Sequence, residues 1–336
     1  MQDINIQIGL KNLEKIGYLD FPIPDDLNIF NAIQNLKKEK NAIILAHYYQ
    51  SNEIQDLADY IGDSLGLAQE AEKTKADIIL FAGVHFMAET AKILNPTKKV
   101  LIPDLHAGCS LSDSCPADVF KIFKDSYTDH KVISYINCSS DIKALSDVIC
   151  TSSNAKAIVE SFPEDQPLIF APDKNLGAYI NKVTGRNMLL WNGSCMVHEI
   201  FSYDKLLDLK KKHPNAKTIG HPECEEDILT LVDFIGSTTQ LLNYSINNNA
   251  KEFIVVTESG ILHQMMISSP NKTFIPAPPN NSCACNDCPH MKRNTPTKIY
   301  NALLYEQPEI IMTNEMIQKA YLPIRKMLDI SALMKL

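Results

Sequence analysis

The sequence predicts an α/β protein of three similar αβα units, each with a small parallel sheet, arranged around a pseudo-threefold axis. Two observations predict it. Short apolar runs rich in β-branched residues alternate with helix-like stretches, as in parallel sheets covered by helices. The same order of runs and polar residues also occurs three times, 86 to 88 residues apart. The expected units are residues 1–110, 111–197 and 198–285, followed by a C-terminal segment, 286–336.

Each predicted unit opens with a buried strand that ends at a pair of polar residues. The three runs are NAIILAHYYQ (41–50), KVISYINCSS (131–140) and AKTIGHPECE (216–225). The pairs are His47 with Tyr49, Tyr135 with Asn137, and His221 with Glu223. Ligands of parallel α/β sheets bind beyond the carboxyl ends of the strands, so these pairs are candidate site residues.

A serine recurs 17, 17 and 16 residues after the first member of each pair, as Ser64, Ser152 and Ser237. Each is expected where a helix begins. An N-cap, whose side chain accepts from a free backbone N–H, explains any one of them. Three equivalent helix starts around one cavity would instead suit a ligand with several carboxylates or phosphates.

Two further apolar runs follow in each unit, and the last of them ends at cysteine. The middle runs are ADIILFAGV (76–84), QPLIFAPD (166–173) and KEFIVVTESG (251–260). The last runs, which begin at residues 98, 187 and 272, lead to Cys109, to Cys195, and to the cluster of Cys283, Cys285 and Cys288. Spacing alone leaves open which cysteine of this cluster corresponds to the other two. Helices are expected at MAETAKIL, IQDLADYIG and EEDILTLVDFI, and over the last 50 or so residues.

Composition limits the classes of partner. The formal charge of -8 and the pI near 5.6 argue against a nucleic-acid or membrane-surface partner, which needs a basic footprint. Neither a run of about 18 apolar residues nor a secretory start is found, so we expect a cytoplasmic protein. Its nine cysteines are then expected to be reduced, and either buried or bound to metal.

Three cysteines at equivalent strand ends favour a metal centre over chance burial as small apolar side chains. A structural zinc ribbon needs two C-x-x-C pairs, and the sequence has only Cys285 with Cys288. An iron-sulfur cluster fits thiolates from three distant segments better. With one cysteine per unit, one iron stays open and could hold substrate oxygens as a Lewis acid.

Several long motifs carry a resemblance to a known family: ILAHYYQ, GDSLGLA, AGVHFMAETAKIL, AGCSLSD, CTSSNA, WNGSCMVHE, HPEC, GSTTQ and CPHM. In this order they resemble the quinolinate synthase family, the A protein of NAD biosynthesis. The resemblance implies a triangular three-domain fold and a 4Fe-4S cluster on three cysteines. It also implies condensation of iminoaspartate with dihydroxyacetone phosphate to quinolinate, phosphate and water.

The resemblance assigns the cluster ligands by motif: Cys109 in A-G-C, Cys195 in W-N-G-S-C-M-V-H, and Cys288 before Pro-His-Met. Cys283 and Cys285 are then not ligands. The spacing here is C-x-C-x-x-C, where family members have C-x-x-C-x-x-C. A disulfide between Cys283 and Cys285 would close a strained ring across one residue.

The resemblance also implies the substrate positions, which are His47, Tyr49, Ser64, Phe86, Tyr135, Asn137, Ser152, His221, Glu223, Ser237 and Thr238. Serine, threonine and asparagine can fix carboxylate and phosphate oxygens, while tyrosine, histidine and glutamate can move protons. We hypothesise that Glu223 is the principal general base, with further donors or acceptors in Tyr135, Tyr49, His221 and His47.

Several neighbouring residues have a second explanation. Phe86 and Met87 would form an apolar wall, although a core pair at a helix start explains them equally well. His198 and Glu199, close to Cys195 in sequence, are expected to support the site or the structure.

The main alternative to an enzyme is a binding module that captures an anionic metabolite and holds a metal as a sensor or staple. Three polar pairs at equivalent strand ends and an open iron favour the enzyme. No G-x-G-x-x-G or P-loop motif follows a strand, which argues against a nucleotide-dependent enzyme. A functional link to L-aspartate oxidase, which makes the unstable iminoaspartate, is a further expectation from the resemblance.

Overall fold

The computed structural model describes residues 11–280 and 286–335. They form two compact units: the first contains residues up to 109 together with 289–318, and the second contains 110–288 together with 319 onward. Cys283 and Cys285 lie outside the described residues. The division into the four segments expected from the sequence stays a prediction, as does the pseudo-threefold arrangement.

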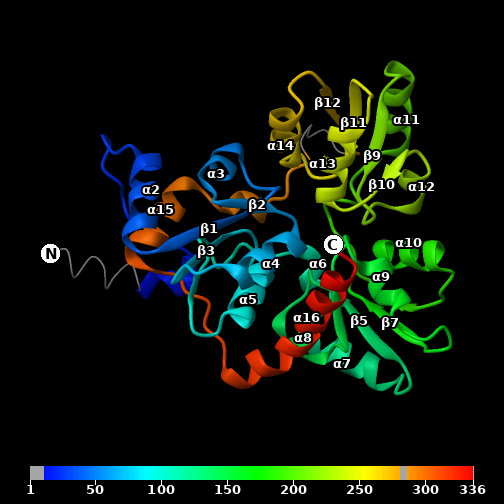
Figure 1. The fold of residues 1–336 in the computed structure, drawn as a ribbon, viewed down its shortest axis with the longest axis horizontal. Coiled ribbons are helices and arrows are strands. Elements are labelled where there is room, and N and C mark those ends of the chain that lie inside the picture. Colours follow the sequence, from blue (N-terminus) through cyan, green and yellow to red (C-terminus); the bar gives the residue numbers. More distant parts are fainter. Residues whose placement is uncertain (1–10, 281–285, 336) are drawn as a thin grey trace. The chain divides into compact units, whose positions relative to one another are not determined.

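Three parallel four-stranded sheets form the framework of the described chain, as the sequence predicts (Figure 1). Their strand orders are equivalent: β2-β1-β3-β4, β6-β5-β7-β8 and β10-β9-β11-β12. The α/β class with three similar units is confirmed.

The strands of the first sheet are β1 Ala42–His47, β2 Tyr60–Gly62, β3 Ile78–Ala82 and β4 Lys99–Leu101. Those of the second are β5 Lys131–Tyr135, β6 Val148–Cys150, β7 Leu168–Ala171 and β8 Leu189–Leu190. Those of the third are β9 Lys217–Gly220, β10 Phe234–Ile235, β11 Glu252–Val256 and β12 Thr273–Pro276.

The edge strands β2, β6 and β10 are absent from the sequence prediction, and two predicted helices are partly wrong for this reason. Helix α3 ends at Leu57 and helix α12 at Leu229, so the Tyr-Ile-Gly and Phe-Ile that follow form β2 and β10. Two or three residues are too few to show the alternation that identifies a strand. The three serines stand two residues beyond these edge strands.

One aspartate directly before each edge strand is hydrogen-bonded to the backbone of the first strand of the same sheet. Its Oδ2 accepts from the backbone N–H of a residue 15 positions earlier, and its own N–H donates to the carbonyl oxygen of that residue. The three sheets therefore share these individual hydrogen bonds as well as their strand order. The pairs are Asp59 with Ile44, Asp147 with Val132, and Asp233 with Thr218, with N–H to Oδ2 distances of 2.8, 2.8 and 2.7 Å.

Replacing Asp147 by Ala is expected to lower the free energy of unfolding by about 1–3 kcal/mol, because the Val132 N–H loses its carboxylate partner in the sheet. The midpoint of urea unfolding measures this loss. Asp129→Ala, at a side chain that is 76% exposed, is the matched control and should leave the midpoint nearly unchanged. Equal midpoints for both variants would show that the hydrogen bond from Val132 to Asp147 does not stabilise the sheet.

Helices cover the sheets, and their bounds follow the chain. In the first unit they are α2 Ile29–Glu39, α3 Asn52–Leu57, α4 Ser64–Lys73, α5 His85–Leu94, the 3-10 turn η1 Met291–Arg293 and α15 Pro296–Tyr305. In the second unit they are α6 Ser110–Asp113, α7 Ala117–Asp125, α8 Ser140–Leu145, α9 Ala155–Glu160, α10 Lys174–Thr184, α11 Tyr203–Lys212, α12 Glu226–Leu229, α13 Thr238–Asn247 and α14 Ile261–Ser268. The last helix, α16 Asn314–Leu333, begins in the first unit and ends in the second.

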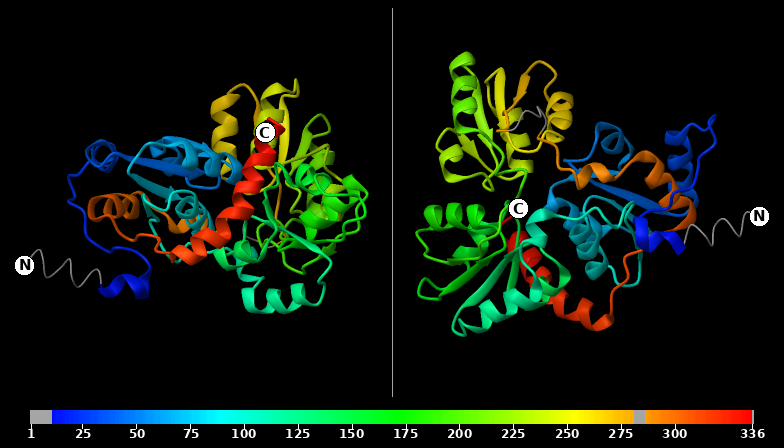
Figure 2. Two further views of the ribbon diagram at one scale, coloured as in Figure 1. Left: turned by 60° about the horizontal axis from the view of Figure 1, so that its bottom comes forward. Right: turned by 180° about the vertical axis from the view of Figure 1, so that it is seen from behind.

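The C-terminal helix α15 returns to the first sheet, where it lies beside α2 in every view (Figures 1 and 2). Ile299 and Leu303 of α15 pack with Ile33 of α2 and with Ile44 and Leu80 of the sheet in one fully buried core. Burial of such apolar side chains is the main driving force for folding. The expectation that the last helices cover a core is confirmed for α15.

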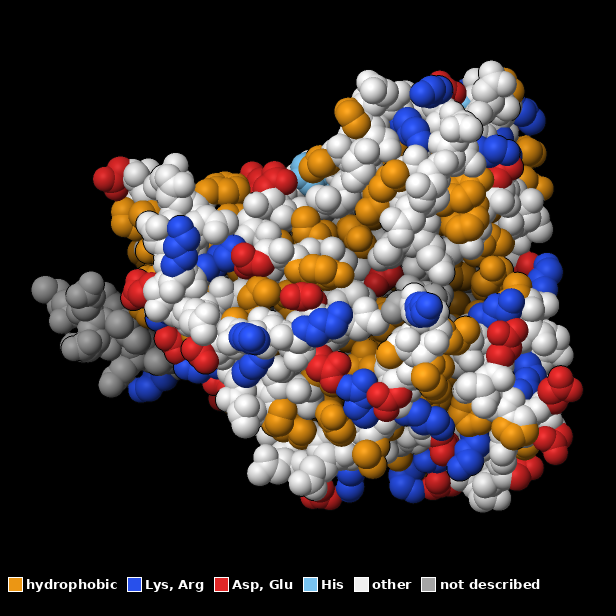
Figure 3. Space-filling view, viewed as in Figure 1, with side chains coloured by type: hydrophobic (Ala, Val, Ile, Leu, Met, Phe, Trp, Pro, Cys, Tyr) orange, Lys and Arg blue, Asp and Glu red, His pale blue; other side chains and the backbone are white. Residues whose placement is uncertain are grey.

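The second and third sheets each have an apolar core of their own within the second unit. Phe120 and Ile169 belong to the core at the second sheet, and Leu206 and Ile254 to the core at the third. Acidic and basic side chains are interspersed on the face shown in Figure 3. Within residues 11–280 and 286–335, no helix combines the length and apolar character needed to span a membrane.

Candidate functional site

The carboxyl ends of the second and third sheets contribute side chains that touch one another within the second unit. The Tyr135 hydroxyl, at the end of β5, is hydrogen-bonded to the carboxylate of Glu223, three residues beyond β9. Ser152 Oγ lies 3.2 Å from His221 Nε2, and Ser153 Oγ donates to Ser237 Oγ at 2.8 Å. The structure therefore brings five residues predicted from the sequence into one site: Tyr135, Ser152, His221, Glu223 and Ser237.

The two carboxylate oxygens of Glu223 have different surroundings, although the side chain is almost fully buried. Oε2 lies 2.6 Å from His198 Nδ1 and 3.7 Å from His221 Nδ1. Oε1 has no hydrogen-bond partner among the described residues. The two oxygens thus differ in their contacts with the described residues.

Charge compensation keeps Glu223 ionised. Burial acts to raise the pKa of its carboxyl, but the charges of His198 and His221 and hydrogen bonds from His198 and Tyr135 outweigh burial and lower the pKa. A buried carboxylate is tolerated when opposite charge and donors surround it. Glu223 is therefore an anion near neutral pH.

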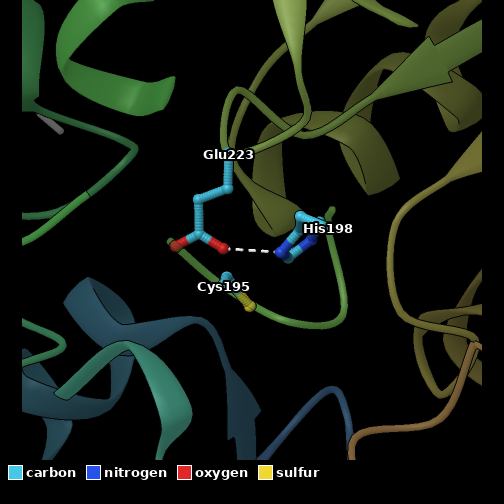
Figure 4. Close-up of side chains that lie close together, drawn as sticks. All are labelled: Cys195, His198 and Glu223. Atoms are coloured by element: carbon cyan, nitrogen blue, oxygen red, sulfur yellow. Dashed lines mark ion pairs between the residues drawn. The ribbon is translucent and has the colours of Figure 1, made fainter. Parts of the chain in front are cut away.

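Figure 4 shows the carboxylate of Glu223 beside the ring of His198, with Cys195 of the same loop nearby. One ligand atom of each of these three residues lies within 4.8 Å of the other two, a grouping that could hold a metal ion. Two ligands of one tetrahedral zinc are about 3.3 Å apart, however. The 2.6 Å contact of Glu223 with His198 is shorter, so we describe it as an ion pair.

Equivalent histidines at two strand ends are oriented by the same backbone contact. His221 Nδ1 accepts from the Glu223 N–H at 3.4 Å, and His47 Nδ1 accepts from the Tyr49 N–H at 3.2 Å. A ring nitrogen that accepts carries no proton, so in the neutral form of either ring the proton lies on Nε2. In His221 this N–H lies toward Ser152.

A second buried carboxyl, Asp173, lies near Glu223 and was not identified from the sequence. Asp173 follows β7, and its Oδ1 caps α10 by accepting from the Leu176 N–H at 2.7 Å. Its Oδ2 has no hydrogen-bond partner in the described chain. Burial and the nearby charge of Glu223 raise the pKa of Asp173 well above its usual range. The opposite directions of the two pKa shifts favour the charge on Glu223 over the charge on Asp173.

In the first unit, the predicted site residues occupy the ends of the first sheet. His47 is buried, and its ring lies 4.4 Å from the ring of Tyr49 in an edge-to-face contact. Lys292 Nζ donates to the Tyr49 carbonyl oxygen at 2.8 Å. Phe86 and Met87 lie buried in the first turn of α5, as either a core pair or an apolar wall would be.

The prediction that each recurring serine begins a helix is correct for two of them and wrong for Ser152. Ser237 is the N-cap of α13 in a capping box, and Thr238 is its first residue, whereas Ser64 is the first residue of α4. Ser152 precedes the N-cap of α9, Asn154, by two residues. Asn154 Oδ1 accepts from the Thr151 N–H, and this turn frees Ser152 to contact His221.

Seven cysteines are described, and their exposure separates them into two groups. Cys109, Cys195 and Cys288 are partly exposed. The others, Cys115, Cys138, Cys150 and Cys224, are buried. Burial raises the pKa of the thiols of Cys115, Cys150 and Cys224. Metals bind thiolates, so the three predicted ligands are the described cysteines best suited to this role.

The loops that carry Cys195 and Cys288, both in the second unit, each have a structural feature that the sequence did not indicate. Glu258 is fully buried, and its Oε1 accepts from the backbone N–H of Cys288 at 3.0 Å. A Cβ at Gly193, two residues before Cys195, would collide with Ser114 Oγ and with the carbonyl oxygen of Pro172. The one signal for Glu258 was its position two residues beyond β11.

Comparison with known proteins identifies the family. The sequence model of the family described as "Quinolinate synthetase A protein" matches residues 31–329. The chain belongs to the quinolinate synthase family. It is 61% identical over 309 residues to the quinolinate synthase of Microcystis aeruginosa strain NIES-843, covering 92% of this chain and 96% of that protein. The quinolinate synthase of Thermosynechococcus vestitus strain BP-1 is 61% identical over 311 residues, at 92% and 97% coverage. That of Nostoc punctiforme is 60% identical over 305 residues, at 91% and 94%.

Membership of the quinolinate synthase family confirms the resemblance seen in the motifs. The roles of the individual site residues stay predictions. His198, which the sequence assigned to a supporting role, is buried between Glu223 and Thr257, since its Nε2 lies 3.0 Å from Thr257 Oγ1. Glu199 forms an ion pair with Lys174 at 3.0 Å on a partly exposed surface.

Proposed function

We propose that this protein is a quinolinate synthase that condenses iminoaspartate with dihydroxyacetone phosphate to quinolinate, releasing phosphate and water, in NAD biosynthesis. Family membership and the names of the relatives support this function. The observation that carries it is the buried carboxylate of Glu223, with one oxygen held by His198 and the other without a partner in the described chain. A carboxylate presented in this way can accept a proton from a bound molecule.

A 4Fe-4S cluster is the proposed cofactor, with Cys109, Cys195 and Cys288 as its ligands. The fit rests on exposure, because these are the described cysteines whose thiols are not buried. When bound, the cluster supplies a Lewis acid, because one of its irons has no protein thiolate.

In this proposal, residues of the second unit act as base, as hydrogen-bond donors and acceptors, and as ligands of anionic groups. Glu223 Oε1 is the base, and the Nε2–H of His221 and the hydroxyl of Tyr135 are donors to developing negative charge. Asn137 Oδ1, which has no partner in the described chain, can accept from an N–H or O–H of the substrate. Ser152, Ser237 and Thr238 are proposed to fix carboxylate or phosphate oxygens.

The first unit is proposed to contribute the equivalent residues. His47 and Tyr49 would transfer protons, Ser64 would bind an anionic group at the start of α4, and Phe86 would pack against the substrate. Because iminoaspartate is unstable, we propose that an L-aspartate oxidase supplies it.

The test is anaerobic purification, analysis of iron and sulfide, and an assay with dihydroxyacetone phosphate and freshly generated iminoaspartate, with quinolinate identified by mass. Product that requires both substrates and the iron-loaded protein supports the proposal. Tight binding of the anionic metabolites by iron-loaded protein without any quinolinate would instead identify a binding module.

A further inference from the structure

We propose that Glu258 is a positioning residue for Cys288, and that it holds the backbone of this ligand in place before any iron binds. The inference rests on the proposed cofactor, because it gives a buried side chain a task toward one of the three proposed ligands. Glu258 is argued to act through the backbone of Cys288 and not on a substrate.

Both carboxylate oxygens of Glu258 accept from backbone N–H groups of the second unit. Oε1 accepts from Cys288 at 3.0 Å, and Oε2 accepts from Gly260 at 2.7 Å. The side chain is fully buried and lies two residues beyond β11. The last torsion of a glutamate side chain is broad and roughly two-fold when nothing holds it. Two accepted hydrogen bonds restrict this torsion, so Glu258 is a fixed acceptor for Cys288.

The segment that ends at Cys288 has further hydrogen bonds to the residues that follow β11 and β12. The Ser259 N–H donates to the Asn286 carbonyl oxygen at 3.3 Å, and Ser259 Oγ donates to Asp287 Oδ1 at 2.5 Å. Asn286 is itself buried, and its Nδ2 donates to the carbonyl oxygen of Ala277, the residue after β12, at 2.5 Å. The whole segment is therefore attached to the third sheet.

The hydrogen bond to Glu258 is the one in this set that the ligand residue itself donates. The Cys288 N–H is directed to a fully buried acceptor, while Cys288 is partly exposed. The backbone is thus held from the protein interior, and the thiol stays accessible to iron. Partners that orient a metal ligand in this way affect metal binding although they do not touch the metal.

Two substitutions separate hydrogen bonding from packing. Glu258→Gln and Glu258→Leu each fill much of the volume of the glutamate side chain. The Gln side chain keeps one oxygen that can accept from the Cys288 N–H, whereas the Leu side chain has no acceptor. A positioning role therefore predicts a large difference between the two variants, and a packing role predicts none.

The first measurement is hydrogen exchange of the Cys288 amide in cluster-free protein. In the unchanged protein this amide should exchange at least about 10-fold more slowly than in an unfolded chain, because it is hydrogen-bonded to a buried group. Exchange should be at least about 10-fold faster than this in Glu258→Leu and within about 3-fold of it in Glu258→Gln.

The second measurement is the rate at which iron-loaded protein loses iron to a chelator under anaerobic conditions. We expect a rate about 10- to 100-fold higher in Glu258→Leu than in the unchanged protein, and less than about 3-fold higher in Glu258→Gln. Glu252→Leu is the matched control, because it makes the same change at the start of β11, where the side chain is 40% exposed. It should leave both rates unchanged.

Equal rates of amide exchange and of iron loss in the Gln and Leu variants would overturn the proposal. A Cys288 amide that exchanges in the unchanged protein as fast as in an unfolded chain would overturn it as well, without any variant. If the unchanged protein takes up no iron and sulfide, the proposed cofactor fails instead, and amide exchange still decides whether Glu258 holds Cys288.

Discussion

Glu223→Gln is expected to lower the rate of quinolinate formation by about 10²- to 10⁴-fold, the range that a general base contributes. The amide retains the size of the side chain but cannot accept a proton as a carboxylate does. The loss should appear in kcat, because Oε1 has no partner within residues 11–280 and 286–335 and is proposed to act on the reacting molecule. Iron content should equal that of the unchanged protein.

The rate is measured with anaerobic, iron-loaded protein under saturating substrates. Glu225→Gln is the matched control: it makes the same chemical change two residues away, at a half-buried side chain. It should retain the full rate. A normal rate in Glu223→Gln at full iron content would remove Glu223 from the role of base.

Serine substitution of any one ligand cysteine should have the second large effect. Cys109→Ser, Cys195→Ser and Cys288→Ser are each expected to purify with little iron and sulfide and to form no measurable quinolinate. A serine hydroxyl is a poor replacement for a thiolate, which is the ordinary ligand of such clusters. Iron and sulfide per chain are the measurement, and quinolinate formation is the second.

Two kinds of cysteine control this experiment. Cys115 is buried, so Cys115→Ala should keep the cluster. Cys283→Ser and Cys285→Ser should also keep it, because the family motif assigns the third ligand to Cys288. Full iron in Cys288→Ser together with loss in Cys285→Ser would show that the motif was assigned to the wrong thiol.

Much of the fold could be predicted because each strand is an unbroken apolar run that stops at polar residues. The run that ends at His47 and the run that ends at Tyr135 are strands β1 and β5 of equivalent sheets. The edge strands carry no comparable signal. Phe234 and Ile235 form a strand only because they lie beside β9, a contact that periodicity cannot reveal.

The candidate site, like the fold, could be predicted only in part from the sequence. Glu223 and His221 were predictable because they directly follow a strand in a repeated pattern. The residues around Glu223 were not predictable, because they are distant in the sequence. Thr257, which contacts His198, lies 34 residues away from Glu223. Asp173 is 50 residues away and looks like an ordinary helix cap. Contacts between loops of different sheets arise only when the chain is folded.

The most direct test of the central claim is to map which thiols react with an alkylating agent before and after anaerobic cluster assembly. In cluster-free protein, Cys109, Cys195 and Cys288 should react rapidly, while the buried thiols of Cys115, Cys150 and Cys224 react only after unfolding. After assembly, all three ligand thiols should become protected together, with about four irons bound per chain. Continued reaction of any one of the three in fully iron-loaded protein would contradict the account.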